Sequence, residues 1–368
     1  MSAKFNPSRL RLARVRRQLT FKSLSDRVGM SARMVSEYEK EYCKVTPPPE
    51  TIEAFAHALN YPVEFFLVPE PIETVSKETV SFRSLKRMRA ASEHAAIGAG
   101  QIGVMINDYF DSRFSLIPNN IPDFRGVEPE AAAEGLRAEW GLGTFSIGNM
   151  IHLLEKHGAR VFSLTENTYD VDAFSFWKGD VPYVFLNTQK SGERSRFDAA
   201  HELGHLILHK HGVSQGKDAE CEADKFAANF LMPKATLLPY KGKTITIDGV
   251  LSLKLNWKVS AMALIVQMKN VGVLSDWQYK SLIITAGKFG LRSREINGIE
   301  REQSIVIEKI LSALESEGIS LHKLAEELLL PLDEISGLLF KFGVVRNNDM
   351  PFGGSASASK VPHLRLVQ

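Results

Sequence analysis

His201-Glu202-Leu203-Gly204-His205 is the stretch that decides the fold of this chain. Residues four apart share one face of a helix, so His201 and His205 can offer two imidazole nitrogens to one metal ion. Glu202 lies beside them, where its carboxylate can take a proton from water that the metal activates. The five residues therefore predict a zinc site with Glu202 as its general base.

The residues around this stretch predict a helix that is buried on one side. Ser195-Arg196-Phe197-Asp198 has the Ser-x-x-Asp pattern of a helix start, so we expect the helix to begin near Arg196. Gly212 is expected to end it. Because the apolar side chains lie on the face away from the histidines, we expect a half-buried helix whose histidines face a cleft.

A second helix is predicted from Glu220 and can return antiparallel to the first. A catalytic zinc ion takes three protein ligands and keeps one position open. Glu220 is the preferred third ligand, because Asp224 one turn later can then accept a hydrogen bond from a ligating histidine. Glu222 points about 200° away on the same helix and is the alternative. His209 continues the four-residue spacing, as a fourth ligand or a polar contact.

The surroundings of the zinc motif follow a longer pattern. It comprises Arg196–Ala200 before the motif, then Leu208-His209, Glu220–Ala227 and Phe230–Pro233. On these residues the block from about 159 to 233 resembles the ImmA/IrrE metallopeptidases. The resemblance implies a compact Zn²⁺ peptidase with a gluzincin-like helix pair and a short sheet, and it assigns Glu220 as third ligand. It also implies a protein substrate, a DNA-binding repressor. An antitoxin-like regulator is the alternative substrate.

Three runs rich in β-branched and aromatic residues precede the zinc helix, at 159–164, 173–177 and 182–187. Such runs predict strands. A strand beside the zinc helix can pair along its edge with an extended peptide and place the scissile bond over the metal. Tyr183 and His209 are the candidates for stabilising the oxyanion.

The N-terminus is strongly basic. Up to Ser36 the chain has nine Lys or Arg residues and one acidic residue, Asp26, whereas the whole chain carries a net charge of +2. Such a local excess is typical of a protein that binds a polyanion. The basic residues are Lys4, Arg9, Arg11, Arg14, Arg16, Arg17, Lys22, Arg27 and Arg33.

These charges lie on a predicted domain of five helices. Thr20 begins the second helix, Gly29 makes the turn and Ser31 caps the third. The pattern resembles the lambda-repressor-type (Cro/C1, XRE) helix-turn-helix domain, in Gly29-Met30-Ser31, Ser36–Glu39, Ile52–Leu59 and Tyr61-Pro62-Val63. The resemblance implies binding to double-stranded DNA, as a homodimer on a two-fold operator.

In this interpretation the third helix enters the major groove. Its base contacts would come from Ala32, Arg33, Met34 and Ser36, and the phosphate contacts from Lys22, Arg14 and Arg17. One position departs from the family, because Phe21 stands where the second helix usually opens with a DNA-contacting Gln. Protein–protein contact is therefore the alternative role of this domain.

Composition favours a cytoplasmic protein without a membrane partner. With 368 residues, 44% of them hydrophobic, the chain can form two or three domains with their own cores. Its two cysteines exclude a disulfide framework. No apolar run approaches the roughly 18 to 20 residues of a membrane span, and the N-terminus lacks the apolar region of a signal peptide.

We predict an α+β protein in five parts. They are a helix-turn-helix DNA-binding domain (1–68), a helical connector (69–125), a metallopeptidase domain (126–290), a helical C-terminal bundle (291–350) and a disordered tail (351–368). The predicted function is that of a DNA-binding zinc metallopeptidase. The alternative is a one-component transcription factor whose peptidase fold senses a metal or ligand without turnover. Glu202 favours the enzyme, since a sensor needs no general base.

Overall fold

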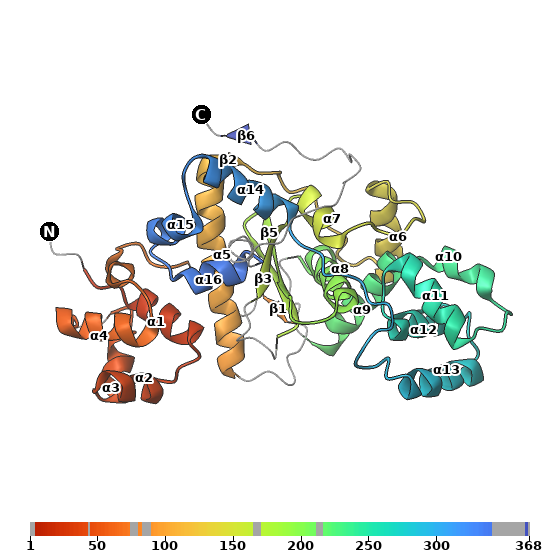
Figure 1. The fold of residues 1–368 in the computed structure, drawn as a ribbon, viewed down its shortest axis with the longest axis horizontal. Coiled ribbons are helices and arrows are strands. Elements are labelled where there is room, and N and C mark those ends of the chain that lie inside the picture. Colours follow the sequence, from red (N-terminus) through yellow and green to blue (C-terminus); the bar gives the residue numbers. More distant parts are fainter. Residues whose placement is uncertain are drawn as a thin grey trace.

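The computed structural model describes residues 4–42, 45–73, 80–82, 90–164, 171–210, 216–340 and 365–366. Helices surround one small central sheet, so the chain has the predicted α+β fold (Figure 1). The helix-turn-helix domain lies at one end of the molecule. Helices α10 to α13, which lie within residues 234–288, are at the other end, beyond the sheet.

The central sheet has the strand order β1-β4-β5-β3. β3 pairs parallel with β5, whereas β4 pairs antiparallel with both β5 and β1. The bounds are β1 Ser81–Phe82, β3 Arg160–Leu164, β4 Ala173–Lys178 and β5 Val181–Asn187. The three strands predicted before the zinc helix are thus confirmed as β3, β4 and β5.

Alternation along the strands gives the sheet two faces. One face carries aromatic rings that belong to the same core as helix α5 (Ala90–Arg113). The other face carries smaller side chains and packs against helix α8 (Gly192–Leu208), beside which helix α9 (Lys217–Leu231) returns. The rings on the α5 side are Phe162, Phe174, Phe176, Tyr183 and Phe185.

The helices α8 and α9 approach most closely at a glycine. A Cβ atom on Gly204 would lie 3.0 Å from Cδ1 of Phe226 and 3.2 Å from Cα of Ala223. The small residue at the fourth position of the zinc motif therefore allows the second helix to pack directly against the first.

We expect Gly204→Val to destabilise the fold by about 1–3 kcal/mol, because the added methyl groups force the two helices apart. Thermal or chemical unfolding measures this loss. Gly148→Val is the matched control, since nothing lies within 4 Å of a Cβ at Gly148. Equal stability of the two variants would contradict the close packing of α8 on α9.

The N-terminal domain has the five predicted helices, the fifth being a 3₁₀ helix. The expected caps are present: Thr20 accepts a hydrogen bond from Ser23 N, and Ser31 accepts one from Met34 N. Gly29 turns the chain with a φ of 68°, a value that favours glycine. The bounds are α1 Pro7–Arg16, α2 Phe21–Val28, α3 Ala32–Tyr38, α4 Pro49–Leu59 and η1 Val63–Leu67.

Further helices pack into the same core as α8 and α9. They are α6 Pro129–Glu139, α7 Met150–Lys156, α10 Lys234–Leu237, η4 Leu238–Tyr240, α11 Ile247–Trp257, α12 Ala261–Asn270 and α13 Asp276–Lys288. In the described ranges no single helix is long and apolar enough to cross a membrane. Only α11 and α12 together reach that length and composition, and they are bent by 97°.

The C-terminal bundle packs on α5 and β3. It consists of α14 Ile305–Ser316, α15 Leu321–Leu328 and α16 Leu332–Leu338. Its apolar residues form one continuous core with the helix-turn-helix domain, α5 and one face of the sheet. Of the predicted disordered tail, only β6 (Arg365–Leu366) is described, and it pairs with β2 (Phe114–Ser115); the rest lies outside the described residues.

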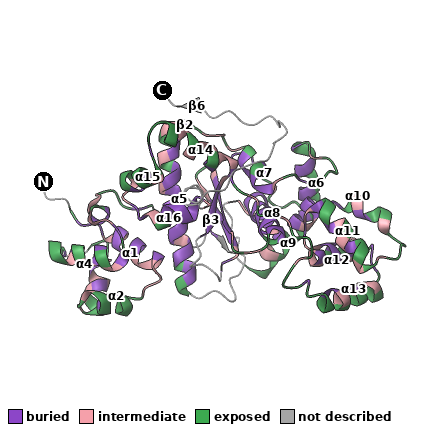
Figure 2. Cartoon of the chain, viewed as in Figure 1, coloured by how far each residue is buried: buried purple, intermediate pink, exposed green. Residues whose placement is uncertain are grey.

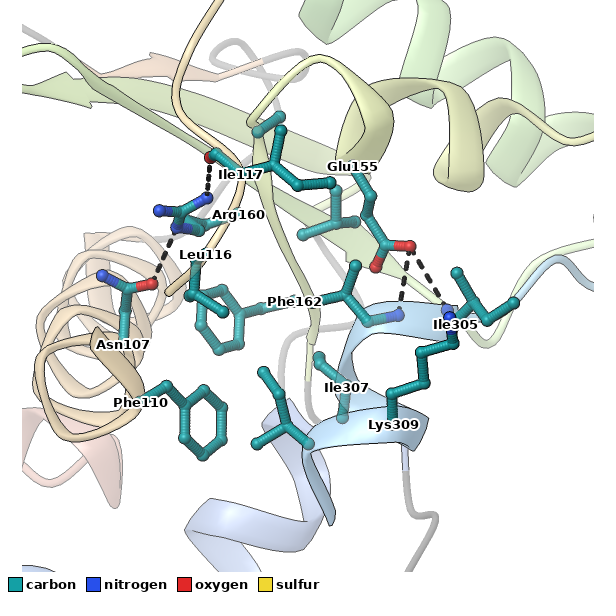
Figure 3. Close-up of a pocket in the computed structure, with 14 residues that line it drawn as sticks. Asn107, Phe110, Leu116, Ile117, Glu155, Arg160, Phe162, Ile305, Ile307 and Lys309 are labelled. Carbon is teal, nitrogen blue, oxygen red and sulfur yellow. Dashed lines mark hydrogen bonds between the residues drawn. The ribbon is translucent and has the colours of Figure 1, made fainter. Parts of the chain in front are cut away.

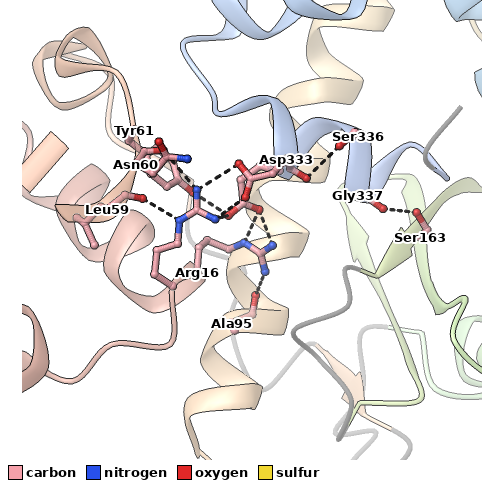
Figure 4. Close-up of polar contacts among 11 residues, drawn as sticks. Arg16, Leu59, Asn60, Tyr61, Ala95, Ser163, Asp333, Ser336 and Gly337 are labelled. Atoms are coloured by element: carbon pink, nitrogen blue, oxygen red, sulfur yellow. Dashed lines mark hydrogen bonds and ion pairs between the residues drawn. The ribbon is translucent and has the colours of Figure 1, made fainter. Parts of the chain in front are cut away.

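A buried ion pair joins the helix-turn-helix domain to this bundle (Figure 4). Arg16 Nε donates a hydrogen bond of 2.9 Å to Glu334 of α16, and its Nη1 donates one of 2.7 Å to the backbone of Ala95 in α5. Tyr61 donates to the other Glu334 oxygen at 3.2 Å. Ser163 of β3 donates in turn to the carbonyl of Gly337. A polar network thus runs from α1 through α16 to the sheet.

Candidate metal centre

Three predicted ligands meet where α8 and α9 pack together. His201 and His205 come from α8 and Glu220 from the first turns of α9, with one ligand atom of each within 4.8 Å of the others. The two Nε2 atoms are 3.0 Å apart. The Glu220 oxygens lie 3.6 Å from Nε2 of His201 and 3.3 Å from Nε2 of His205. We call these three residues the metal trio.

Asp224 orients the first histidine of the trio. Its Oδ1 lies 2.9 Å from Nδ1 of His201. A carboxylate can only accept a hydrogen bond, so Nδ1 carries the ring proton and Nε2 keeps its lone pair toward the trio. The spacing Glu220-x-x-x-Asp224 predicts this contact between Asp224 and a ligating histidine.

The second histidine is oriented by residues that the sequence left as alternative ligands. Nδ1 of His205 lies 3.0 Å from Nδ1 of His209, whose Nε2 lies 2.8 Å from Oε2 of Glu222. Because Glu222 accepts, His209 donates from Nε2 and accepts at Nδ1, so His205 donates from Nδ1. Nε2 of His205 therefore also presents a lone pair to the trio. Burial lowers the pKa of His205 to about 4, which keeps the ring neutral at pH 7.

The trio fits a zinc ion. In a tetrahedral site with Zn–N distances of 2.0–2.1 Å, neighbouring ligand atoms lie about 3.3 Å apart. Within the described part of the chain, the buried Oε1 of Glu220 makes no hydrogen bond, although two imidazoles face it. Two lone pairs and a carboxylate thus converge on one point.

Glu202 is fully buried and is held by the sheet. Its Oε2 accepts a hydrogen bond of 2.7 Å from Oγ of Ser175 in β4. Ser175 could not be identified from the sequence, where its only signal is a hydroxyl residue within an aromatic strand. Ser175 fixes one oxygen of the predicted general base.

The predicted bounds of the zinc helix are wrong. The helix begins at Gly192, because Ser191 accepts a hydrogen bond from Arg194 N and so caps it one turn earlier than expected. It ends at Leu208, before Gly212.

The expectation of a half-buried zinc helix is also wrong. The sheet covers one side of α8 and α9 the other, so α8 is buried along nearly its whole length (Figure 2). His201 has no exposed surface, and the trio reaches solvent through Glu220, whose side chain is 25% exposed. Tyr183 lies on the opposite, α5 face of the sheet and cannot stabilise an oxyanion at the trio.

Of the residues predicted to contact DNA, five are exposed or half-buried, and the two arginines are engaged in ion pairs. Lys22 and Arg33 are exposed, and the side chains of Ala32, Met34 and Ser36 on α3 are half-buried. Met34 also packs against the core of its domain.

The two arginines predicted to contact phosphate make ion pairs inside the protein. Arg14 donates to both oxygens of Glu39, at 2.5 and 2.7 Å, and Phe21 covers its guanidinium at 4.2 Å. Arg17 pairs with Asp333 of α16 at 2.6 Å. Phosphate contact by either arginine would require these pairs to break, and Phe21 packs on the Arg14 pair at the position where the family has its Gln.

A separate pocket that contains no member of the trio lies between α5, β3, α7 and α14 (Figure 3). Its walls are mainly apolar side chains, such as Phe110, Leu116 and Phe162. At its edge the Glu155 carboxylate accepts hydrogen bonds from Ser304 Oγ and from the first backbone N–H groups of α14. Burial raises the pKa of Glu155 to about 7.

We expect Glu155 to make the fold less stable as the pH rises. Its folded pKa of about 7 exceeds the ordinary 4.5, so its contribution is fully present below pH 4.5 and is lost as the pH rises through 7. The shift corresponds to about 3 kcal/mol. Between pH 5 and pH 8, chemical denaturation should show a larger decrease in the free energy of unfolding for the wild type than for Glu155→Gln. Parallel pH profiles of the two proteins would contradict this assignment.

Two family models match the chain. A peptidase-family model described as the IrrE N-terminal-like domain matches residues 154–269, from α7 through the sheet, α8 and α9 into α12. A helix-turn-helix model matches residues 10–66. None of the curated proteins matches the chain. The chain therefore carries an IrrE N-terminal-like peptidase-family domain behind an N-terminal helix-turn-helix domain of the XRE type.

Proposed function

We propose that this protein is a zinc-dependent endopeptidase that cleaves a protein substrate, a repressor or an antitoxin-like regulator. The observation that carries the proposal is the convergence of His201, His205 and Glu220, with Glu202 next to His201 on the same helix. The match of this region to a peptidase-family model supports it. We further propose that the helix-turn-helix domain binds double-stranded DNA.

Zinc held by the trio would supply Lewis-acid polarisation of a peptide carbonyl and activation of water for attack. Glu202 accepts the proton of the attacking water and delivers it to the leaving amine. The hydrogen bond from Ser175 keeps the carboxylate in one orientation during both transfers. Asp224 and His209 hold the two imidazoles with their Nε2 lone pairs toward the position that a zinc ion would take.

The experiment that tests the peptidase compares new protein N-termini, by mass spectrometry, in host cells that make the wild type or Glu202→Gln. Termini found only with the wild type would establish proteolysis and identify the substrate. Identical termini, with zinc bound in both proteins, would favour the transcription factor that senses a metal or ligand.

For the DNA-binding domain, we expect Arg33→Ala to weaken specific binding by about 1–3 kcal/mol and to relax the sequence preference at the base it contacts. Lys22→Ala should weaken binding to all sequences evenly and reduce the salt dependence by about one unit of slope. Both are measured on fragments that the wild type selects from genomic DNA. Two copies per selected site are expected. If the wild type enriches no DNA, the domain serves protein contact instead.

A further inference from the structure

One edge of the sheet lies beside the proposed catalytic carboxylate. Ser175 of β4 donates to Glu202, and β4 is the second strand from the β1 edge, so this is the nearer edge of the sheet. The opposite edge strand, β3, is contacted by α16, and its Ser163 accepts a hydrogen bond from Phe340 N. An extended peptide that pairs with the strand that holds Glu202 must therefore use the side of β4 that faces away from β5.

Residues of the chain itself already occupy this edge. β1 pairs antiparallel with β4, with Ser81 opposite Ser175 and Phe82 opposite Phe174. Neighbouring strands lie about 4.8 Å apart, so the backbone of β1 runs alongside the residue that holds Glu202. Val80, directly before β1, is fully buried in the core that includes α5 and anchors the segment.

The outer edge of a strand has one row of N–H and C=O groups and can pair with one partner at a time. We infer that β1 is an internal competitor, which excludes an extended peptide from β4 until residues 81–82 are displaced. This inference rests on the proposed peptidase function, whose substrate it describes as an extended segment paired with β4.

Two zinc-binding probes distinguish pairing with the β4 backbone from binding to the metal alone. Acetohydroxamate needs only the metal, whereas a tri-alanine hydroxamate carries the same group on an extended peptide. The double variant Ser81→Pro/Phe82→Pro removes both backbone N–H donors of β1. In the zinc-loaded full chain, we expect the peptide probe to bind this variant about tenfold more tightly than the wild type, as for the loss of one or two competing hydrogen bonds. Acetohydroxamate should bind both proteins equally.

The control is Ser81→Ala/Phe82→Ala, which keeps the backbone donors and should bind both probes like the wild type. Equal affinity of the peptide probe for the proline variant and the wild type, with acetohydroxamate bound by both, would overturn the inference and leave the proposed function standing. Failure of both zinc-loaded proteins to bind acetohydroxamate would overturn the metal site itself. A wild-type chain that cuts itself at residues 80–82 would show that the segment is a substrate, which also overturns its role as competitor.

Discussion

Glu202→Gln is expected to keep its zinc and to cleave substrate about 100- to 10,000-fold more slowly than the wild type. The amide has the size of the carboxylate and can accept the same hydrogen bond from Ser175, so the buried position stays filled. It cannot accept the proton of the attacking water. The proposed metal ligands His201, His205 and Glu220 are unchanged, so we expect zinc to stay bound. The rate is measured on the purified proteins with the substrate that the N-terminal comparison identifies, and the zinc content by elemental analysis.

Ser175→Ala is the companion variant, because it leaves the carboxylate in place and removes the group that orients it. We expect a smaller loss of rate than in Glu202→Gln, with zinc again retained. Loss of zinc from Glu202→Gln would contradict the assignment of Glu202 as general base, since it would show that the carboxylate holds the metal.

Glu334→Gln is expected to destabilise the fold by about 3–5 kcal/mol, the largest change in stability that we expect from a single substitution. Arg16 and Glu334 are both almost fully buried, with side chains 3% and 2% exposed. Burial would lower the pKa of Arg16, but Glu334 raises it, so the guanidinium stays charged. Without Glu334 this charge remains buried and uncompensated. Chemical denaturation of the full chain measures the loss.

Asp333→Asn provides the control, because its side chain is 56% exposed and its pair with Arg17 should contribute at most about 1 kcal/mol. Replacing both members of the buried pair, as Arg16→Met/Glu334→Leu, should restore most of the stability. If Glu334→Gln and Asp333→Asn are equally stable, the Arg16 pair does not hold the helix-turn-helix domain to the bundle.

Much of the candidate metal centre could be predicted from spacing along the chain. His201 and His205 are one helical turn apart and Asp224 follows Glu220 by one turn, so helix geometry places each pair on one face. The strand runs and the caps at Thr20 and Ser31 are equally local, and the structure has them where they were predicted. The predicted start of α8 was wrong, because Ser191 and Ser195 can both cap a helix and the sequence alone does not show which of them does so.

Contacts between distant segments could not be predicted in this way. Ser175 and Glu202 meet only because β4 packs against α8. The same holds for the basic N-terminus, whose charge count indicates a polyanion partner. In the fold, Arg16 pairs with Glu334, which is 318 positions away, and Arg17 pairs with Asp333, which is 316 positions away.

The sequence by itself thus determined the elements whose cause is local: the zinc motif, the return helix, the capped helices and the strands. Only the tertiary structure decided which charges are neutralised, which face of the sheet each strand residue takes and what occupies the edge of β4. The physical reason is that periodicity and capping act over one or two turns. Burial, ion pairing and strand order depend instead on which segments the folded chain brings together.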